Sequence, residues 1–406
     1  MKYIILLGDG MADYPLKELD GKTPLEYART PHMDGLARTG TVGLIDTIPQ
    51  GKTPGSDVAN LAVLGYDPVK FHTGRGPLEA ASMGVALETT DVAFRCNLIT
   101  LTDDGTMIDD FNAQHITSEE AGEIIADIDA QLGSSSFRFY PGVSYRHLLV
   151  WKEGPSEFET TPPHDIVGQT IAGHLPRGSR AGEIRGLMER SQEILRDHPV
   201  NRARIEAGKK PANSLWLWGE GRAPAMEPLT KRFNITGGMI SAVDLLKGIG
   251  VYAGLDVIHV PGATGYTDTD YAGKAEHALR YLRDHDFIFI HVEAPDEMGH
   301  EGNIEGKVGS IEDFDAKVVG TMVKGLPELG DYRIAVLSDH PTPIELRTHI
   351  SDPSPLVVSS SLDTPAEGGT ATFGETAARA SGLVVSPGYG FMDHFMGDWR
   401  ALVEKR

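Results

Sequence analysis

Six side chains that bind metal ions well stand just after apolar segments of the sequence. Three are carboxylates and three are imidazoles, and they include one Asp-x-x-x-His pair and one adjacent Asp-His pair. They are Asp9, Asp296, His300, Asp339, His340 and His349. Oxygen and nitrogen donors without sulfur suit Mn²⁺, Zn²⁺ or Co²⁺ better than Ca²⁺. Six donors are too many for one tetrahedral ion, so the set predicts two ions that share a substrate oxygen.

Each of these residues also has a simpler explanation when it is taken alone. A single Asp-x-x-x-His pair is more often a helix-capping acid and a surface histidine than a metal site. What favours the metal site is that all of these residues follow apolar segments and have proline or glycine neighbours. Chance rarely produces that arrangement, so we expect the residues to act as one group.

A serine stands where a helix is expected to begin. Pro54-Gly55-Ser56-Asp57 precedes an apolar segment that starts at Val58. A serine in this place usually caps the helix with its hydroxyl group. The same place also suits a nucleophile, because free backbone N–H groups and the helix dipole stabilise an alkoxide and a phosphate attached to it. The sequence leaves both interpretations of Ser56 open.

No nucleotide-binding motif accompanies this serine. Gly51-Lys52-Thr53 is similar to the end of a phosphate-binding P-loop, but that motif requires a glycine where this sequence has Asp46. No Gly-x-Gly-x-x-Gly segment follows an expected strand. The sequence therefore gives no local indication of ATP or of a dinucleotide.

Alternating apolar and amphipathic segments set the expected fold. Strands are expected at 3–7, 215–218, 257–260, 287–292 and 333–338, and helices at 271–284 and 304–326. This order of strands and helices predicts an α/β fold with a mostly parallel sheet between helices. Ligands bind beyond the carboxyl ends of the strands in such sheets, and the acids and histidines lie at those ends.

Length and composition limit the classes of protein to which the chain can belong. The 406 residues predict two or three domains. A net charge of -21 repels phosphate backbones and anionic lipid, so we expect neither a nucleic-acid nor a membrane partner. The single cysteine, Cys96, cannot form an internal disulfide. A cytoplasmic protein is expected, and its oligomeric state is left open.

Several motifs occur in a fixed order along nearly the whole chain. They are Leu7-Gly8-Asp9-Gly10-Met11-Ala12-Asp13, Thr53-Pro54-Gly55-Ser56-Asp57-Val58-Ala59-Asn60, Leu64-Gly65-Tyr66-Asp67-Pro68, Gly74-Arg75-Gly76-Pro77, Glu293-Ala294-Pro295-Asp296-Glu297-Met298-Gly299-His300, Leu337-Ser338-Asp339-His340 and Arg347-Thr348-His349. The ordered set resembles the cofactor-independent (2,3-bisphosphoglycerate-independent) phosphoglycerate mutases of the archaeal type. That family belongs to the alkaline-phosphatase-like superfamily of metalloenzymes.

The resemblance implies a domain organisation and a metal centre. An alkaline-phosphatase-like α/β core would comprise residues 1–85 and 206–406, and a smaller inserted α+β domain, residues 86–205, would be a substrate-binding lid. One ion would be held by Asp9, Ser56, Asp339 and His340, and the other by Asp296, His300 and His349. Mn²⁺ is the expected ion, ahead of Zn²⁺, Co²⁺ and Mg²⁺.

The reaction implied by the resemblance is the interconversion of 3-phosphoglycerate and 2-phosphoglycerate in glycolysis and gluconeogenesis. The phosphoryl group would pass through a phosphoserine at Ser56, and the partner would be a small phosphorylated hydroxy acid. Closure of the inserted domain would have to exclude water from the phosphoserine. The base for the substrate hydroxyl would come from that domain, where His164 and Asp165 are the candidates. A loop cap explains these two residues equally well.

Further residues are expected to hold the substrate. Lys307 matches a lysine of the family that contacts the phosphoryl group, although a solvated helix lysine is an equal alternative. Arg146, Asn201 and Arg204 are similar to anion-holding residues, and surface arginines are again an even alternative.

One segment departs from the family pattern. Asp110-Phe111-Asn112-Ala113-Gln114-His115 stands where archaeal mutases carry an arginine-rich run. Guanidinium groups are the best ligands for a carboxylate and a phosphate held together, so their absence bears on the acceptor. In this respect the chain is similar to a bacterial paralogue group proposed as homoserine kinases. An ATP-using, homoserine kinase-like phosphotransferase is therefore the alternative function. A non-catalytic scaffold is disfavoured, because every core ligand is present.

Overall fold

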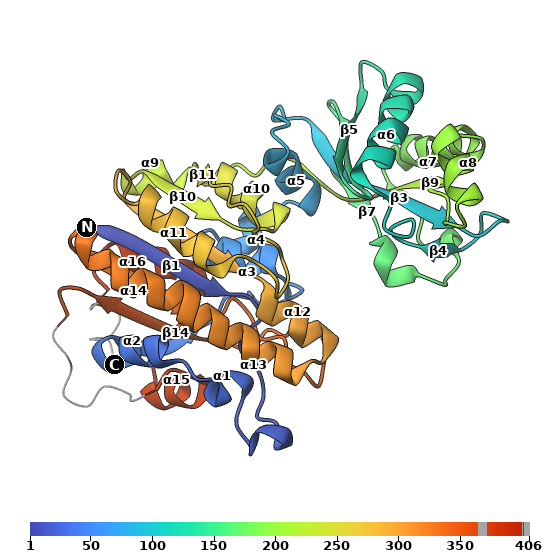
Figure 1. Cartoon of the computed structure of the whole chain (residues 1–406). Helices are drawn as coiled ribbons and strands as arrows, with labels where there is room; N and C mark the ends of the chain where they lie inside the picture. Colours follow the sequence, from blue (N-terminus) through green and yellow to red (C-terminus); the bar gives the residue numbers. More distant parts are fainter. Residues whose placement is uncertain (364–371, 400, 402–406) are drawn as a thin grey trace. The chain divides into compact units, whose positions relative to one another are not determined.

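The structure is a computed structural model, and it describes residues 1–363, 372–399 and 401. The chain divides into two compact units, which are treated separately below. Unit 1 comprises Met1–His72 and Ala225–Arg406, and unit 2 comprises Thr73–Pro224 (Figure 1). Unit 2 is thus inserted into the sequence of unit 1.

The sequence analysis expects the inserted domain at residues 86–205. Unit 2 begins earlier than residue 86 and ends later than residue 205. Both differences have the same physical reason, which is packing on β3 (Val92–Leu101). The helix α5 (Arg75–Ser82) contacts this strand, and β9 (Ser214–Gly221) pairs with it in antiparallel orientation. The two segments are therefore parts of the inserted unit's own core.

Within the described residues, the sheet of unit 1 has eight strands in the order β11-β10-β12-β1-β13-β14-β2-β15. Their bounds are β1 Lys2–Gly8, β2 Thr41–Ile45, β10 Gly237–Ile240, β11 Asp256–Val257, β12 Phe287–Val292, β13 Tyr332–Leu337, β14 Ser354–Ser360 and β15 Val384–Val385. The neighbouring strands β11, β10, β12, β1 and β13 run parallel, whereas β14 is antiparallel to both of its neighbours. This is the mostly parallel sheet that the sequence predicts.

Helices cover both faces of this sheet, as the apolar segment of β1 requires. Ile4 and Leu6 are fully buried in a core shared with α11 (Tyr271–Tyr281). Successive residues of a strand point to opposite faces. On the other face, Tyr3 packs edge-to-face against Phe395 of α16 (Phe391–Met396) at 5.9 Å between ring centroids. A strand buried on both faces is continuously apolar, which is why this segment lacks polar alternation.

The long helix expected from residue 304 is interrupted. α13 (Ile304–Asp313) leads into a wider π-helical turn at Phe314–Val319, and α14 (Gly320–Gly325) follows it. In the turn, the buried carboxylate of Asp315 accepts hydrogen bonds from two backbone N–H groups at the start of α2 (Pro31–Thr39). These partners lie far away in the sequence, so the helical pattern alone could not show them.

Unit 2 has an antiparallel sheet, and its described residues give the order β4-β3-β6-β5 with β9 paired to β3. The further bounds are β4 Ile108–Asp110, β5 Phe137–Val143 and β6 Arg146–Trp151. Apolar residues of α6 (Ser118–Leu132) and α7 (Ala181–Arg196) share its buried core. Thr117 and Glu120 form a capping box at the start of α6, where the sequence predicts a helix start. Unit 2 is therefore an α+β unit.

Across the residues that the structure describes, no helix is both long enough and apolar enough to span a membrane.

Candidate metal centre and nucleophile

The three central strands of unit 1 end side by side, and each is followed by predicted ligands. Gly8 at the end of β1 pairs with Val292 of β12, and Leu7 pairs with Leu337 of β13. Asp9 follows β1 directly, Asp339 and His340 follow β13, and α12 (Ala294–Glu301) follows β12 with Asp296 and His300. The parallel sheet thus brings residues that are far apart in sequence to one edge.

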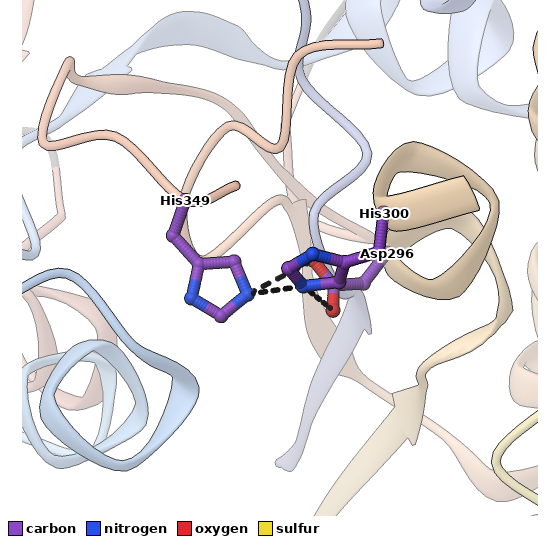
Figure 2. A group of neighbouring side chains, drawn as sticks. All are labelled: Asp296, His300 and His349. Atoms are coloured by element: carbon purple, nitrogen blue, oxygen red, sulfur yellow. Dashed lines mark hydrogen bonds and ion pairs between the residues drawn. The ribbon is translucent and has the colours of Figure 1, made fainter. Parts of the chain in front are cut away.

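The predicted ligands form two groups, and within each group the ligand atoms lie within 4.8 Å of one another. Asp9, Asp339 and His340 form the first group, and all three are buried. Asp296, His300 and His349 form the second (Figure 2). In this group, His300 Nε2 lies 2.8 Å from His349 Nε2 and 3.2 Å from Asp296 Oδ2. The grouping matches the division of ligands that the family resemblance implies.

The electrostatics of the first group fit a divalent cation. Burial and the neighbouring carboxylates, Asp339 foremost, raise the pKa of Asp9 well above its usual range. No hydrogen-bond partner reaches the buried Asp9 Oδ1 among the described residues. A buried carboxylate oxygen without a partner is costly, and a cation beside it would remove that cost and the repulsion between the acids.

The second group shows the complementary pattern. Burial alone would raise the pKa of Asp296, but hydrogen bonds from His300 and His349 outweigh it and hold the pKa well below its usual range. The hydrogen bond to Asp296 is also the main reason why the pKa of His300 is raised to about 9. One carboxylate and two imidazoles that converge on a point form a mixed oxygen and nitrogen donor set suited to Mn²⁺, Co²⁺ or Zn²⁺.

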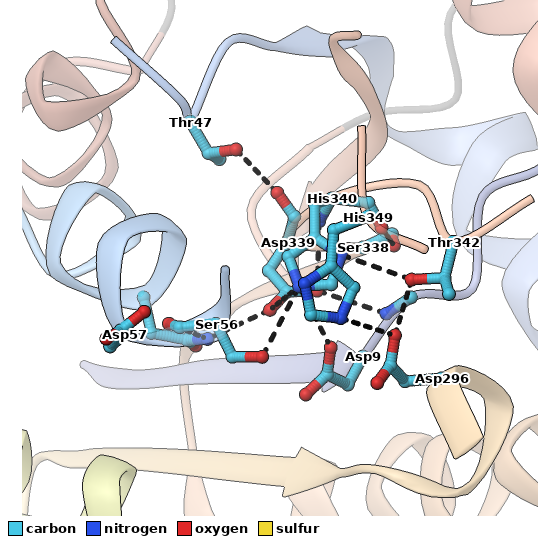
Figure 3. Close-up of polar contacts among 12 residues, drawn as sticks. Asp9, Thr47, Ser56, Asp57, Asp296, Ser338, Asp339, His340, Thr342 and His349 are labelled. Atoms are coloured by element: carbon cyan, nitrogen blue, oxygen red, sulfur yellow. Dashed lines mark hydrogen bonds and ion pairs between the residues drawn. The ribbon is translucent and has the colours of Figure 1, made fainter. Parts of the chain in front are cut away.

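Ser56 is the first residue of α3 (Ser56–Val63), and its side chain is directed at the first ligand group (Figure 3). Its Oγ lies 3.3 Å from His340 Nε2. The capping residue is Gly55, and no side-chain cap hydrogen bond is found in this described segment, so Ser56 is not an N-cap. Asn60 of the same helix donates to the Ser56 carbonyl at 2.9 Å and to Asp339 Oδ2 at 3.0 Å. The helix is thereby tied to the ligand group.

Two threonines that the sequence analysis did not single out support the ligands (Figure 3). Thr342 Oγ1 donates to Asp296 Oδ1, and Thr47 Oγ1 donates to the backbone carbonyl of Asp339. Outer partners of this kind orient metal ligands and tune their affinity. Thr342 follows the Asp339-His340 motif closely enough to have been found, whereas Thr47 carries no sequence signal.

The contacts of Lys307 differ from the one expected for it, a contact with the phosphoryl group. The side chain is fully buried in α13, and its ammonium forms a 2.7 Å ion pair with Asp13. It also donates to the carbonyl oxygens of Ala12 at 3.3 Å and Thr342 at 2.9 Å. These contacts use all three N–H donors of the group. Lys307 therefore ties together two loops that carry metal ligands, which is a structural task.

Asn201 and Arg204 of α8 (Pro199–Glu206) are also structural, contrary to the anion-holding role expected for them. The buried Arg204 guanidinium pairs with Glu120 at 2.6 Å and donates to two backbone carbonyls. The Asn201 amide exchanges two 2.8 Å hydrogen bonds with the backbone of Ala212. Both residues fix loops of unit 2 to its helices.

A different set of arginines gathers in unit 2, around Trp218. The guanidinium carbon of Arg95 lies 4.4 Å from the centroid of the Trp218 ring, and that of Arg75 lies 5.9 Å from it. His164 packs edge-to-face on the same indole at 5.5 Å between centroids. The predicted residue Arg146 lies opposite Asn97 on the strand next to β3. We call Arg75, Arg95, Arg146, His164 and Trp218 the arginine cluster.

Charge in the arginine cluster is concentrated and partly buried. Burial lowers the pKa of Arg95, and the nearby charges of Arg75 and Arg146 lower it further against the opposite effect of Glu79. Burial also lowers the pKa of His164, with Asp165 acting against it and the arginines in the same direction. Asp165 is exposed and lies 3.6 Å from the His164 ring. Sequence analysis missed Arg95 because it stands in an apolar strand, whereas Arg75 lay in a quoted motif.

Relatives of known family account for the whole chain. A family model described as 2,3-bisphosphoglycerate-independent phosphoglycerate mutase matches residues 37–201. The chain is 54% identical to a probable 2,3-bisphosphoglycerate-independent phosphoglycerate mutase of Geobacter sulfurreducens, across 97% of the chain and 99% of the relative. It is 52% identical to the enzyme of that name from Methanosarcina barkeri, across 95% of the chain and 97% of the relative.

Solved structures agree with these sequence matches. A protein from Pyrococcus horikoshii superposes with a TM-score of 0.82 at 30% identity, covering 100% of this chain and 98% of that one. A cofactor-independent phosphoglycerate mutase from Thermoplasma acidophilum gives a TM-score of 0.68 at 28% identity, covering 98% and 99%. With relatives more than half identical along nearly its whole length, the chain belongs to the family of 2,3-bisphosphoglycerate-independent phosphoglycerate mutases.

Proposed function

We propose that the protein interconverts 3-phosphoglycerate and 2-phosphoglycerate through a phosphoserine on Ser56, at a site that holds two divalent ions. This reaction would serve glycolysis and gluconeogenesis. The observation that carries the proposal is the direction of Ser56, whose Oγ lies 3.3 Å from His340 in the first ligand group. A serine used only as a helix cap would turn its oxygen toward the backbone of its own helix.

Two divalent ions, when bound, would lower the pKa of the Ser56 hydroxyl and neutralise the phosphoryl oxygens. The first ion would be held by Asp9, Ser56, Asp339 and His340, and the second by Asp296, His300 and His349. Mn²⁺ is our proposal for the native ion, because both groups combine imidazole nitrogen with carboxylate oxygen.

The chain's own residues carry the transfer in two balanced halves. Ser56 Oγ forms a bond to the phosphorus as the bond to the 3-oxygen breaks, and the serine proton ends on that oxygen. The positive end of the α3 helix dipole, where Ser56 stands, stabilises the negative charge on the new phosphoserine. In the second half, the 2-oxygen of glycerate loses its proton and takes the phosphoryl group, and Ser56 regains a proton.

Glycerate must stay bound after the first phosphoryl transfer and until the second. We propose that the arginine cluster of unit 2 holds its carboxylate during this time. Guanidinium groups bind carboxylates in bidentate geometry, and the surrounding indole and partial burial strengthen such a bond. Arg146 keeps the anion-holding role that the sequence analysis gave it, and Arg75 takes the place of Asn201 and Arg204. His164 is retained as the candidate base, since its lowered pKa leaves it unprotonated near neutral pH.

The test is conversion without a nucleotide. Protein loaded with Mn²⁺ is incubated with 3-phosphoglycerate, and the products are followed by phosphorus NMR. We expect 2-phosphoglycerate to form without ATP and inorganic phosphate to stay low. Ser56→Ala serves as the inactive control. Phosphorylation of homoserine that requires ATP, with 3-phosphoglycerate unchanged, would overturn the mutase proposal and support the kinase alternative.

A further inference from the structure

A buried histidine stands directly behind the first ligand group. His291 lies on β12, in parallel register with Leu7 of β1, and its side chain has no exposed surface. Its Nε2 lies 2.8 Å from Asp9 Oδ2, and its Nδ1 lies 3.3 Å from Ser241 Oγ. A polar residue within an otherwise apolar buried strand requires a reason, because burying an imidazole without partners is costly.

The hydrogen bonds around His291 fix which ring nitrogen carries the proton. With a cation bound, Asp9 is ionised and its carboxylate can only accept, so Nε2 is then the donor and Nδ1 of the neutral ring is an acceptor. Ser241 Oγ accepts from the Val243 N–H at 3.0 Å, which leaves its hydroxyl proton for Nδ1. The His291 carbonyl is held in turn by the buried Lys274 ammonium at 3.1 Å. The ring therefore has a single orientation and a single tautomer.

This orientation divides the two oxygens of Asp9 between two tasks. Oδ2 is engaged by His291, whereas the buried Oδ1 has no hydrogen-bond partner among the described residues and lies 3.5 Å from Nε2 of His340, a second ligand of the first group. We propose that His291 is a positioning residue that presents Asp9 Oδ1 alone to the metal ion of the first group. The inference rests on the proposed two-metal function. It adds the requirement that the first site depend on a histidine outside the set of ligands.

A purely structural role for His291 predicts a different result, so metal binding can separate the two. Metal-free protein is titrated with Mn²⁺ in a calorimeter for the parent, His291→Leu and His291→Gln. Leucine fills the space without a donor, while the glutamine amide can donate from nearly the same place. The matched control is His198→Leu, which removes another buried histidine that pairs with a carboxylate, Asp127 of unit 2, at 3.0 Å.

We expect two Mn²⁺ sites in the parent, and a loss of about 10–100-fold in affinity at one of them in His291→Leu. The other site should stay within about threefold, as should both sites in His291→Gln and in His198→Leu. Two sites of parental affinity in His291→Leu would overturn the proposal. An equal loss at both sites, or a loss in His291→Gln as large as in His291→Leu, would also overturn it by indicating a general effect on folding.

A milder variant keeps the test decisive if His291→Leu does not fold. Ser241→Ala removes the partner that fixes the tautomer but leaves the donor to Asp9, so it should weaken the same site by a smaller factor. Unchanged Mn²⁺ affinity in Ser241→Ala together with a loss in His291→Gln would then overturn the proposal. If the calorimetric titrations give the expected results but the parent does not catalyse the mutase reaction, only the proposed function is contradicted. A parent that binds no Mn²⁺ would contradict both the proposed function and the role of His291.

Discussion

The two units of this protein concentrate opposite charge. In unit 1, burial and the neighbouring carboxylates raise the pKa of Asp9, whereas in unit 2 burial and the charges of Arg75 and Arg146 lower the pKa of Arg95. Each cluster gathers like charges, and in unit 2 the Glu79 carboxylate lies among them, 3.0 Å from Arg95 Nε. We infer that unit 1 attracts cations and that unit 2, with its excess of guanidinium groups, attracts an anion. One chain with a net charge of -21 keeps both, because each cluster has its own low-dielectric surroundings.

The clusters also differ in how they are supported. Ligands of unit 1 are fixed by directional hydrogen bonds, such as those of Asn60 to Asp339 and of Thr342 to Asp296. The arginine cluster adds to one ion pair, that of Arg95 with Glu79 at 3.0 Å, the face of Trp218, which offers attraction without a fixed direction. We infer that ligand binding in unit 1 depends on exact side-chain geometry, whereas ligand binding in unit 2 depends mainly on charge. Substitutions should accordingly affect unit 1 more severely.

The largest effect is expected for Ser56→Ala. Removing the nucleophile should lower the rate of isomerisation by roughly 10³-fold or more, because no other group can take the phosphoryl group. Mn²⁺ content should change little, since the other ligands remain. The matched control is Ser381→Ala in the same unit, which removes a hydroxyl that donates to the carbonyl of Ala378 and accepts from the Leu383 N–H. A Ser56→Ala enzyme within about tenfold of the parent would remove this serine from the nucleophile role.

Removal of the metal should have an effect of similar size. Dialysis against a chelator is expected to abolish activity, and Mn²⁺ or Co²⁺ should restore it better than Ca²⁺. The physical reason is that His300, His340 and His349 offer imidazole nitrogen, which Ca²⁺ binds poorly. Elemental analysis accompanies the rate measurements. Full activity in protein shown to contain no metal would contradict the two-metal proposal.

Two arginines of unit 2 should respond in opposite ways to the same substitution. Arg75→Met is expected to lower kcat/KM by about 10–100-fold, the value of a hydrogen bond to a charged group. Arg204→Met should leave the kinetics of the folded protein unchanged but lower the free energy of unfolding by about 3 kcal/mol, because it breaks a buried ion pair with Glu120. Kinetics and urea unfolding are measured on both variants. Exchanged outcomes would restore Arg204 to substrate binding.

The smallest effect concerns the pH dependence of unit 2. Burial lowers the pKa of His147 to about 3, far below the roughly 6.5 of an unfolded chain. The folded state then binds fewer protons between these values, so stability falls as the pH falls through this window. His147→Asn cannot titrate, yet it can still accept from the Gly142 N–H as Nδ1 does at 3.0 Å.

Between pH 7 and pH 5, the parent should lose about 2 kcal/mol more than His147→Asn. Urea unfolding followed by tryptophan fluorescence suits this test, since unit 2 contains Trp151, Trp216 and Trp218. An equal loss in both proteins would show that His147 is protonated in the folded state.

The sequence predicted the features that depend on order along the chain. Apolar strands with Asp or His at their ends were enough to predict the parallel sheet and the gathering of these residues at one edge of it. Their division into two ligand groups came from the family resemblance. The sequence could not predict features that depend on a distant partner. Lys307 was assigned to the phosphoryl group because nothing local shows that Asp13 neutralises it. Nothing local in the sequence shows that Arg204 pairs with Glu120. The contact of Arg95 with Trp218 could not be predicted either, because Arg95 stands in an apolar strand.

The most direct test of the account is to trap the phosphoryl group on the protein. Mn²⁺-loaded enzyme is mixed with 3-phosphoglycerate labelled in the phosphate, quenched in acid within milliseconds, and digested for mass spectrometry. The account predicts label on the peptide that contains Ser56, at a level that falls as substrate is exhausted, and none in Ser56→Ala. Label on a different residue in an enzyme that isomerises at full rate would contradict it.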